Sequence, residues 1–299
     1  MNGNFLSLAN IINKNGIKLK ISDFEFLEPS FLLGVLSLYK TGIIEVDCSS
    51  LNREIDNYLN RINFYKYLSL NSSNINRFEN NNLVEITSIN RDTNGSETTE
   101  IAKKIIQNMG ISFQVENKYV FGAFEWIFRE LIDNTIQHSK ANFDKGGSFF
   151  MLQAYPNRRE LHICIVDNGI GIKESFRKSK YWNEDLSELD YIKLAFERGK
   201  TSDSNIGAGN GLYWTKEIVK KTNSKLNYLT GNTLFTINGD EEKFFSQKEN
   251  WWNGVLLDIN INLDNLSSVD IVDWLKKVGN NSSFVDLELD DREYDELFL

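Results

Sequence analysis

The chain has 299 residues, of which 41% are hydrophobic and 12% aromatic, enough to form the cores of two domains of ordinary size. Its formal net charge is −9, which argues against binding to a nucleic-acid backbone, because such binding needs basic surface. The start of the sequence lacks the pattern of a signal peptide, and no stretch of about 18 apolar residues occurs. We therefore expect a cytoplasmic protein that contacts neither nucleic acid nor membrane.

The first third predicts a small α/β unit. Residues 17–26 alternate in polarity and predict a strand, and Pro29 can open the helix that continues through SFLLGVLSLYK. Residues 43–49 predict a short buried strand, and residues 51–68 an amphipathic helix. The order strand, helix, strand, helix predicts a parallel strand pair.

The start of the predicted helix in this unit contains a Pro-Ser pair. The stretch FLEPSFLLGVLSLY, with Pro29 and Ser30 at the helix start, resembles the STAS-like domain, the fold of anti-sigma antagonists. In that family a serine at this place can accept phosphate, and Ser30 is the matching position. The alternative is an ordinary capping serine.

An asparagine- and serine-rich stretch at 70–82 is typical of a linker or surface loop. Residues 83–89 predict a strand, and residues 98–110 a helix with Gly110 at its C-terminal cap.

A helix over residues 121–138 carries two parallel stripes. Glu130, Asn134 and His138 are spaced four residues apart, so they share one face of the helix. Beside them runs an apolar stripe at helical spacing: Phe121, Phe124, Phe128, Leu131, Ile132 and Thr135. A carboxylate, an amide and an imidazole beside an apolar stripe are typical of a helix that lines a cleft. A solvent-exposed polar face is the alternative.

The run ELHICIVDNGIGI predicts a buried strand that ends at Asp167. A buried carboxylate needs a partner, because its desolvation is costly. Gly169 and Gly171 allow the backbone to adopt positive φ and to approach a ligand closely. The alternative for Asp-Asn-Gly is a turn without a ligand.

A long connection at 173–206 contains a helix ending near Gly199 and then leads to a glycine-rich stretch. Residues 207–212 read GAGNGL and precede a predicted helix, so their backbone N–H groups are suited to hold an anion. The long connection also carries basic side chains that could contact a phosphate or remain in solvent: Lys178, Lys180, Arg198 and Lys200.

The order E-x-x-x-N, strand-D-x-G-x-G and G-x-G-x-G-L, over roughly residues 115–262, resembles the GHKL ATPase superfamily of gyrases, heat-shock chaperones, mismatch-repair proteins and histidine kinases. The run ELIDNTIQHS is most similar to the anti-sigma serine kinases. The resemblance implies a Bergerat-type two-layer α/β sandwich with a mixed sheet, and ATP and Mg²⁺ as ligands. Neither histidine lies in a phosphoacceptor helix pair, so a self-phosphorylating histidine kinase is not expected.

The resemblance also assigns roles. Glu130 would be the catalytic base, Asn134 the one direct metal ligand, and Asp167 the acceptor for the adenine amino group. The remaining nucleotide contacts would be Gly169, Gly171, Lys200, Gly207, Gly209, Asn210, Gly211 and Leu212. The sequence departs from the family at Gly254-Val255, where a Gly-Thr hydroxyl usually supports the aspartate. Either Thr233 or Thr236 replaces it, or the adenine pocket is weaker.

We therefore predict a STAS-like domain at 1–90, an ATPase domain at 95–265, and a C-terminal helix with an acidic tail at 266–299. The first functional hypothesis is an ATP-hydrolysing conformational switch that signals to a protein partner. The second is a serine/threonine kinase acting on a STAS-like partner, and the third is a nucleotide sensor without turnover. A homodimer is compatible with the resemblance.

Overall fold

The computed structural model describes residues 8, 16–24, 27–69, 83–89, 118–138, 147–202, 210–249, 252–266 and 274. Side chains are described for all of these except 118–126, 138 and 266. No described helix combines the length and the apolar character needed to cross a lipid bilayer. The predicted helix at 98–110 and the acidic tail lie outside the described residues.

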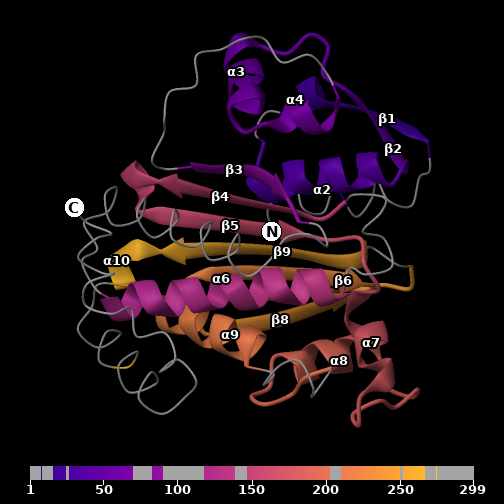
Figure 1. Cartoon of the computed structure of the whole chain (residues 1–299), viewed down its shortest axis with the longest axis vertical. Coiled ribbons are helices and arrows are strands. Elements are labelled where there is room, and N and C mark those ends of the chain that lie inside the picture. Colours follow the sequence, from indigo (N-terminus) through magenta and orange to yellow (C-terminus); the bar gives the residue numbers. More distant parts are fainter. Residues whose placement is uncertain are drawn as a thin grey trace.

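A seven-stranded sheet organises the molecule, in the order β3-β4-β5-β9-β6-β7-β8 (Figure 1). Its strands are β3 (Leu83–Ser88), β4 (Phe149–Tyr155), β5 (Glu160–Val166), β6 (Lys225–Gly231), β7 (Thr233–Asn238), β8 (Glu241–Ser246) and β9 (Trp252–Asn262). Every neighbouring pair in it is antiparallel. The α/β sandwich is confirmed, but the sheet expected to be mixed is antiparallel throughout.

Short connections account for the antiparallel pairs β4–β5, β6–β7 and β7–β8, because antiparallel strands can be joined by tight turns. Two glycines at these connections have positive φ: Gly231, the last residue of β6, and Gly239, between β7 and β8. β8 was not predicted, since its sequence, EEKFFS, carries three charges and has no clear alternation.

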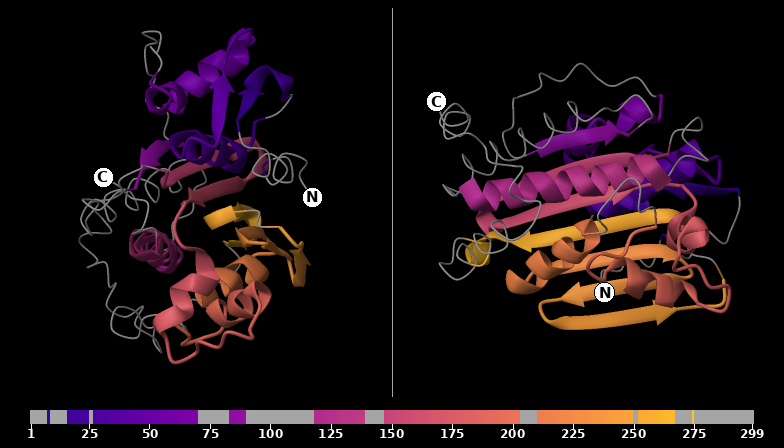
Figure 2. Two further views of the ribbon diagram at one scale, coloured as in Figure 1. Left: turned by 90° about the vertical axis from the view of Figure 1, so that its right-hand side faces the viewer. Right: turned by 60° about the horizontal axis from the view of Figure 1, so that its bottom comes forward.

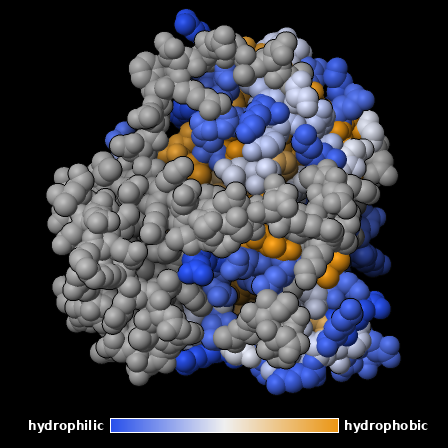
Figure 3. Space-filling model, in the orientation of Figure 1, coloured by the Kyte–Doolittle hydropathy of each residue, from blue (hydrophilic) through white to orange (hydrophobic). Residues whose placement is uncertain are grey.

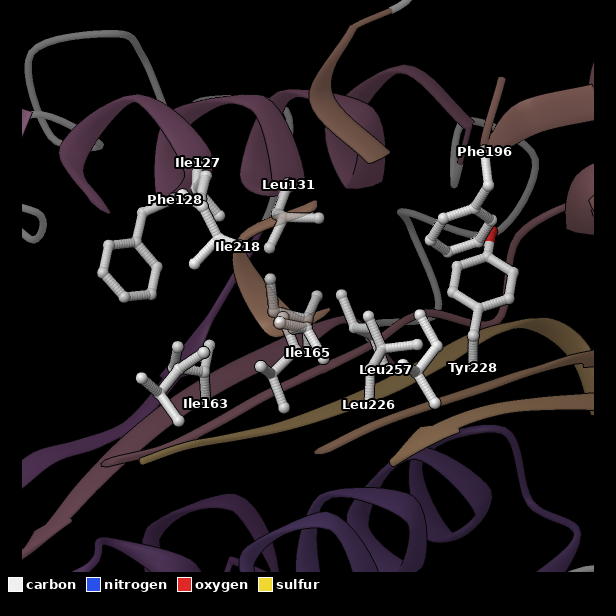
Figure 4. Close-up of a cluster of buried hydrophobic side chains, with 14 of the residues drawn as sticks. Ile127, Phe128, Leu131, Ile163, Ile165, Phe196, Ile218, Leu226, Tyr228 and Leu257 are labelled. Carbon is white, nitrogen blue, oxygen red and sulfur yellow. The ribbon is translucent and has the colours of Figure 1, made fainter. Parts of the chain in front are cut away.

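The helices of the predicted ATPase domain lie on one face of this sheet, as expected. They are α6 (Lys118–His138), α7 (Gly171–Ser175), α8 (Glu188–Ala195) and α9 (Gly211–Lys221). The longest, α6, runs lengthwise along the strands (Figures 1 and 2). Phe128 and Leu131 of α6 pack with Ile163 and Ile165 of β5 and with Ile218 of α9 (Figure 4). We call this side of the sheet the front face.

Helix α2 (Pro29–Lys40) packs on the opposite side of the sheet, which we call the back face. Its buried residues Phe31, Leu32 and Leu36 share a core with Met151 of β4 and Leu256 of β9. Figure 4 shows this helix below the sheet, with α6 above it. The sheet is therefore covered by helices from both parts of the chain.

The strands serve both cores through their alternation. In β5, Ile163 and Ile165 point to the front core, whereas Cys164 and Val166 point to the back core. This is the period of two that a pleated strand imposes. It explains why the strand is almost entirely apolar in sequence.

The remaining N-terminal elements gather at one end of the molecule (Figure 1). β1 (Ile17–Lys20) and β2 (Ile44–Asp47) form a separate two-stranded parallel sheet, as the element order predicted. The predicted helix at 51–68 is divided into α3 (Arg53–Arg61) and α4 (Phe64–Tyr67) by Asn63, at φ 65°. The STAS-like division at residue 90 remains a prediction. β3, inside that predicted unit, pairs with β4 of the large sheet.

Ser30 lies in the first turn of α2 and is 2% exposed. Glu28 occupies the N-cap of this helix, where no side chain caps the backbone. The expected capping role for Ser30 is therefore wrong, because the helix begins at Pro29, two residues before the position at which a cap by Ser30 would start it.

The described surface that faces the viewer in Figure 3 is mainly hydrophilic, with apolar residues in small patches. Ile170, between the two glycines that follow Asp167, is the exposed large apolar side chain among the described residues, at 40% exposure. A small helix, α10 (Leu263–Leu266), follows β9.

Candidate functional site

A cavity opens on the front face between α6, α7, α9 and strands β5, β6 and β9. It holds about 1060 Å³ of space, including its open mouth. Its side chains include Glu130, Leu131, Asp133, Asn134, Gln137, Ile165, Asp167, Ile172, Phe176, Lys200, Thr201, Ser202, Leu212, Tyr228, Val255 and Leu257. A large hollow in which apolar side chains and converging polar groups both line the wall is a common form of a small-molecule site.

Asp167 is the buried polar group at the apolar end of this cavity. It follows the last residue of β5 and is 3% exposed. Burial raises the pKa of its carboxyl to about 7, although hydrogen bonds from the Gly169 and Val255 backbones oppose the shift. The Gly169 N–H donates to Oδ1 at 2.8 Å. A carboxylate held in this way is an acceptor that favours a ligand N–H donor over bulk water.

Two glycines leave space around Asp167. A Cβ on Gly254 would overlap both the backbone oxygen and the carboxylate of Asp167. Gly171 has φ 73°, and a Cβ on it would lie 2.9 Å from the carbonyl oxygen of Asn253. Only a glycine therefore fits this backbone and this close approach. The pairing of β6 with β9 shifts register between Thr230, opposite Val255, and Gly231, opposite Trp252. The two β9 residues between them, Asn253 and Gly254, therefore form a bulge beside the cavity.

The hydroxyl expected beside Asp167 is not supplied by Thr233. The Thr233 hydroxyl pairs with Asn232 and with Ser246 on β8, 2.8 Å away. Thr236 points to a different surface hollow, between strands on the back face. Both proposed replacements are wrong, because these positions on β7 are one strand beyond β6. Val255 itself lines the cavity.

Helix α6 contributes several oxygen-bearing side chains to the lining of the cavity, among them Glu130, Asp133 and Asn134. Burial raises the pKa of Glu130, the charge of Asp133 raises it further, and Arg129 opposes this shift. Burial also raises the pKa of Asp133. Two partly desolvated carboxylates one turn apart with an amide oxygen are suited to a hard cation that prefers oxygen ligands.

The start of α9 lies against Glu130. A Cβ on Gly211 would stand 2.8 Å from the Glu130 Cβ and 2.9 Å from its Oε2. The helix therefore approaches α6 closely only because residue 211 is glycine. The first-turn N–H groups of a helix have no partner within the helix, and they carry its positive end.

Hydrogen bonds hold both ends of the long connection that follows α7. Oδ1 of Asn210 accepts from the Gly199 N–H at 3.1 Å, which joins the two ends of residues 199–210. Glu188 at the start of α8 accepts from the Lys173 N–H at 3.3 Å and from the Thr230 hydroxyl. Lys200 lines the cavity, with its Nζ 4.5 Å from the centre of the Tyr181 ring.

The structure brings together seven of the residues selected from sequence, and they all line the cavity: Glu130, Asn134, Asp167, Gly171, Lys200, Gly211 and Leu212. Gly169 and Asn210 are not part of the lining and act as backbone and side-chain supports instead. Gly207 and Gly209, and the side chain of His138, lie outside the described residues.

Sequence reasoning missed Asp133 and Tyr228. The helical spacing between Glu130 and Asp133 could have indicated the former, because residues three apart on a helix are neighbours. Tyr228 gave no such signal, since a tyrosine within a β-strand is ordinary. Its ring packs edge-on against Phe196 at 5.3 Å, and burial raises its pKa far above the usual value.

This fold and cavity define an α/β sandwich with an open cavity between its helix layer and its sheet. Residues 122–243 match the family model described as "Histidine kinase-, DNA gyrase B-, and HSP90-like ATPase". The match supports the GHKL superfamily for this part of the chain and implies ATP binding. It ends before β9, which contributes Val255 and Leu257 to the same cavity. No curated protein showed significant similarity to the chain.

Proposed function

We propose that the protein binds ATP with Mg²⁺ in this cavity and hydrolyses the nucleotide as a conformational switch that signals to a protein partner. The observation that carries the hydrolysis is Glu130, a half-buried carboxylate in the same cavity as Asp167 and beside the start of α9. A site that only held the nucleotide would have no use for such a carboxylate next to the anion-binding end.

In this proposal the adenine enters the apolar end of the cavity. Its amino group donates to Asp167, and the ring lies among Ile165, Tyr228 and Leu257. The phosphates then extend toward α9, whose first-turn N–H groups and helix dipole favour an anion. Lys200 lines the same cavity and adds a positive charge.

The oxygen ligands of α6 fit a magnesium ion. Asn134 would be its direct protein ligand, and Asp133 lies one residue away in the same cavity. When bound, Mg²⁺ neutralises phosphate charge and prefers to complete its coordination with phosphate oxygens and water.

Glu130 would act as the general base. Its raised pKa brings it closer to neutrality, where a base combines availability with strength. It takes a proton from a water as the water oxygen bonds to the γ-phosphorus, and the bond from that phosphorus to the bridging oxygen of ADP breaks. The products are ADP and inorganic phosphate, and the proton passes to solvent. Most of the catalysis is positioning and charge neutralisation.

The alternative is protein kinase activity, in which a partner's hydroxyl replaces the water. The similarity of ELIDNTIQHS to the anti-sigma serine kinases favours it. A STAS-like partner protein would then be the acceptor. Ser30 is an unsuitable acceptor in this conformation, because it is buried in the first turn of α2.

The test follows γ-labelled ATP with Mg²⁺ in the wild type, in Glu130→Gln and in the control Glu54→Gln, an exposed residue of α3. We expect free phosphate from the wild type and from the control. Glu130→Gln should retain ATP binding and lose about 100-fold or more in hydrolysis.

Full turnover by Glu130→Gln would refute the base assignment. Label on an added STAS-like protein, in place of free phosphate, would establish the kinase. ATP binding with neither product would leave a nucleotide sensor.

A further inference from the structure

Two consecutive residues at the end of β5 point to opposite faces of the sheet. The alternation that sends Ile165 to the front core and Val166 to the back core continues beyond the strand. Asp167 consequently enters the front cavity, whereas Asn168 turns toward α2 and is 6% exposed. The presumed adenine acceptor and a back-face amide are thus joined by one peptide bond.

Asn168 makes buried hydrogen bonds to Ser37, two residues beyond the middle of α2. Its Nδ2 donates to the Ser37 carbonyl at 3.1 Å and also contacts the Ser37 hydroxyl. That hydroxyl donates to the Gly147 carbonyl at 2.7 Å. Ser37 is fully buried, so these groups have no access to bulk water as an alternative partner.

The absence of a side chain at Gly147 makes this contact possible. A Cβ at Gly147 would stand 2.9 Å from Nδ2 of Asn168. The start of β4, the end of β5 and α2 therefore meet at a single buried polar junction. Other buried residues in the back core are joined mainly by apolar contacts, which tolerate small displacements better than a hydrogen bond does.

The backbone of Asp167 is held from the same side. Nε1 of Trp252, buried in the back core with α2, donates to the Asp167 carbonyl at 2.7 Å. The Asp167 N–H donates to the Val255 carbonyl at 2.8 Å. The back face thus constrains the main chain of the residue whose side chain serves the front cavity.

We propose that Ser37 and Asn168 are positioning residues that set the base-recognising carboxylate of Asp167, and that α2 thereby couples the N-terminal part of the chain to the nucleotide site. This inference rests on the proposed ATP site. A shift of α2 along the sheet would pull on Asn168 and, through one peptide unit, reorient Asp167. Because coupling between two sites is reciprocal, nucleotide binding would equally stabilise this part of α2.

An ordinary buried hydrogen bond would stabilise the fold without changing which base is bound. The discriminating quantity is therefore base selectivity, the ratio of the dissociation constants for GTP and ATP. It depends on Asp167, whose acceptor matches the adenine amino group and opposes the carbonyl oxygen of guanine.

The experiment compares the wild type with Ser37→Ala, Asn168→Ala and the double variant. Ser30→Ala serves as the matched control, because it makes the same change at an equally buried serine of the same helix. Dissociation constants are measured for ATP, GTP and inorganic tripolyphosphate, each with Mg²⁺. Thermal unfolding without nucleotide records any loss of stability.

We expect Asn168→Ala, which removes the bonds to both the carbonyl and the hydroxyl of Ser37, to weaken ATP binding about five- to tenfold. Ser37→Ala removes the hydroxyl and keeps the carbonyl bond, so it should weaken ATP binding about two- to threefold. Binding of GTP and of tripolyphosphate should stay as in the wild type, so selectivity falls by the same factor. The double variant should be no worse than Asn168→Ala alone, because that change already removes both hydrogen bonds between Asn168 and Ser37. Ser30→Ala should retain wild-type selectivity.

Unchanged selectivity in both folded single variants, whatever their stability, would overturn the inference and leave the proposed function standing. A wild type that binds tripolyphosphate but neither nucleotide would overturn the proposed adenine site, and this inference with it. The two failures are therefore distinguishable.

A measurement on the wild type alone covers the case in which the variants do not fold. Hydrogen exchange is followed with and without ATP at the Thr41 amide, which donates to the Ser37 carbonyl at 3.2 Å. We expect ATP to slow exchange there about fivefold or more, while α3 stays unchanged. Equal exchange at Thr41 with saturating ATP would overturn the coupling.

Discussion

The two faces of the large sheet are built from the same strands but differ in what they enclose. On the back face α2 packs directly on β4, β5 and β9, and its core includes the fully buried Phe31 and Leu36. On the front face α6 and α9 pack along the strands, but a cavity remains beside Asp167.

The difference lies in the residues that approach the sheet. A helix with ten consecutive buried residues, as at Pro29 to Leu38, packs closely on the strands that it covers, and the hollow on this face lies beside its first turn, at Ser30 and Thr236. The front helices instead present Glu130, Asn134 and Gly211 where they approach one another, and these cannot form a dry core. The back face is therefore packed with apolar side chains beneath α2, whereas the front face combines an apolar core with a cavity suited to a ligand.

The sharpest way to test this division is to remove a large side chain from the back core. Phe31→Ala should lower the free energy of unfolding by about 3–5 kcal/mol, because it leaves a cavity in a packed core. Base selectivity should remain that of the wild type at a temperature where the variant is folded. Denaturant unfolding and ATP titration measure the two quantities.

Phe31→Leu is the control for Phe31→Ala, and it should cost less because it leaves a smaller void. Loss of base selectivity in Phe31→Ala would mean that the back core as a whole, and not the junction at Ser37, sets the nucleotide site.

A second change adds a methyl group next to Asp167, at Gly254 of β9. Gly254→Ala would force a Cβ into the Asp167 carboxylate and carbonyl, which should cost about 1–3 kcal/mol of stability and weaken ATP binding about tenfold or more. Gly42→Ala is the control: a Cβ there meets nothing within 4 Å, but φ is 74°, so it should lower stability through backbone strain and leave ATP affinity unchanged. Titration with ATP and denaturant unfolding compare the two. Wild-type ATP affinity in Gly254→Ala would show that Asp167 is not positioned by its close neighbour.

The third prediction concerns the pH dependence of stability. The Asp167 carboxyl has a pKa near 3.8 when unfolded and about 7 when folded, since burial disfavours its charge. Its contribution to stability is therefore fully present below pH 4 and is lost as the pH rises through 7. The slope is at most about 1.4 kcal/mol per pH unit.

Asp167→Asn removes this titration. Unfolding free energies of wild type and Asp167→Asn are measured without nucleotide from pH 4 to pH 8. The wild type should lose stability relative to Asp167→Asn as the pH rises. A constant difference would show that the front cavity does not desolvate Asp167.

The smallest effect is expected at the mouth of the front cavity. Lys200→Ala should weaken ATP binding about two- to fivefold, because a partly exposed charge interacts through solvent. Lys193→Ala is the control: its Nζ lies 5.4 Å from the centre of the Phe244 ring and does not line the cavity. Titrations at low and high salt compare them. Equal loss in both variants would mean that general charge, not the position of Lys200, attracts the nucleotide.

Local periodicity predicted most of the elements correctly. Pro29 opens α2 as expected, the run ending at Asp167 is a buried strand, and the helix of residue 134 extends from Lys118 to His138. Spacing alone also placed Glu130 and Asn134 on one helix face, and both line the cavity. These features depend on neighbours within one or two turns or along one strand, so the sequence contains the information.

Other features depend on residues that are distant along the chain. The contact of Asn168 with Ser37 joins positions 131 residues apart, and the shape required of Gly254 depends on the register of β6 with β9. No local pattern specifies a partner at such a separation. The same holds for Thr233, whose hydroxyl was expected beside Asp167 and instead faces β8.

Local patterns in the sequence were enough to predict most of the strands and helices, the polar stripe of α6 and the acidic residue after β5, because backbone periodicity and local sterics act over a few residues. They did not predict β8, the cover of the back face by α2, the place of Asp133 and Tyr228 in the cavity, or the contact of Asn168 with α2. These are outcomes of packing, in which segments far apart in sequence compete to bury the same surface of one sheet.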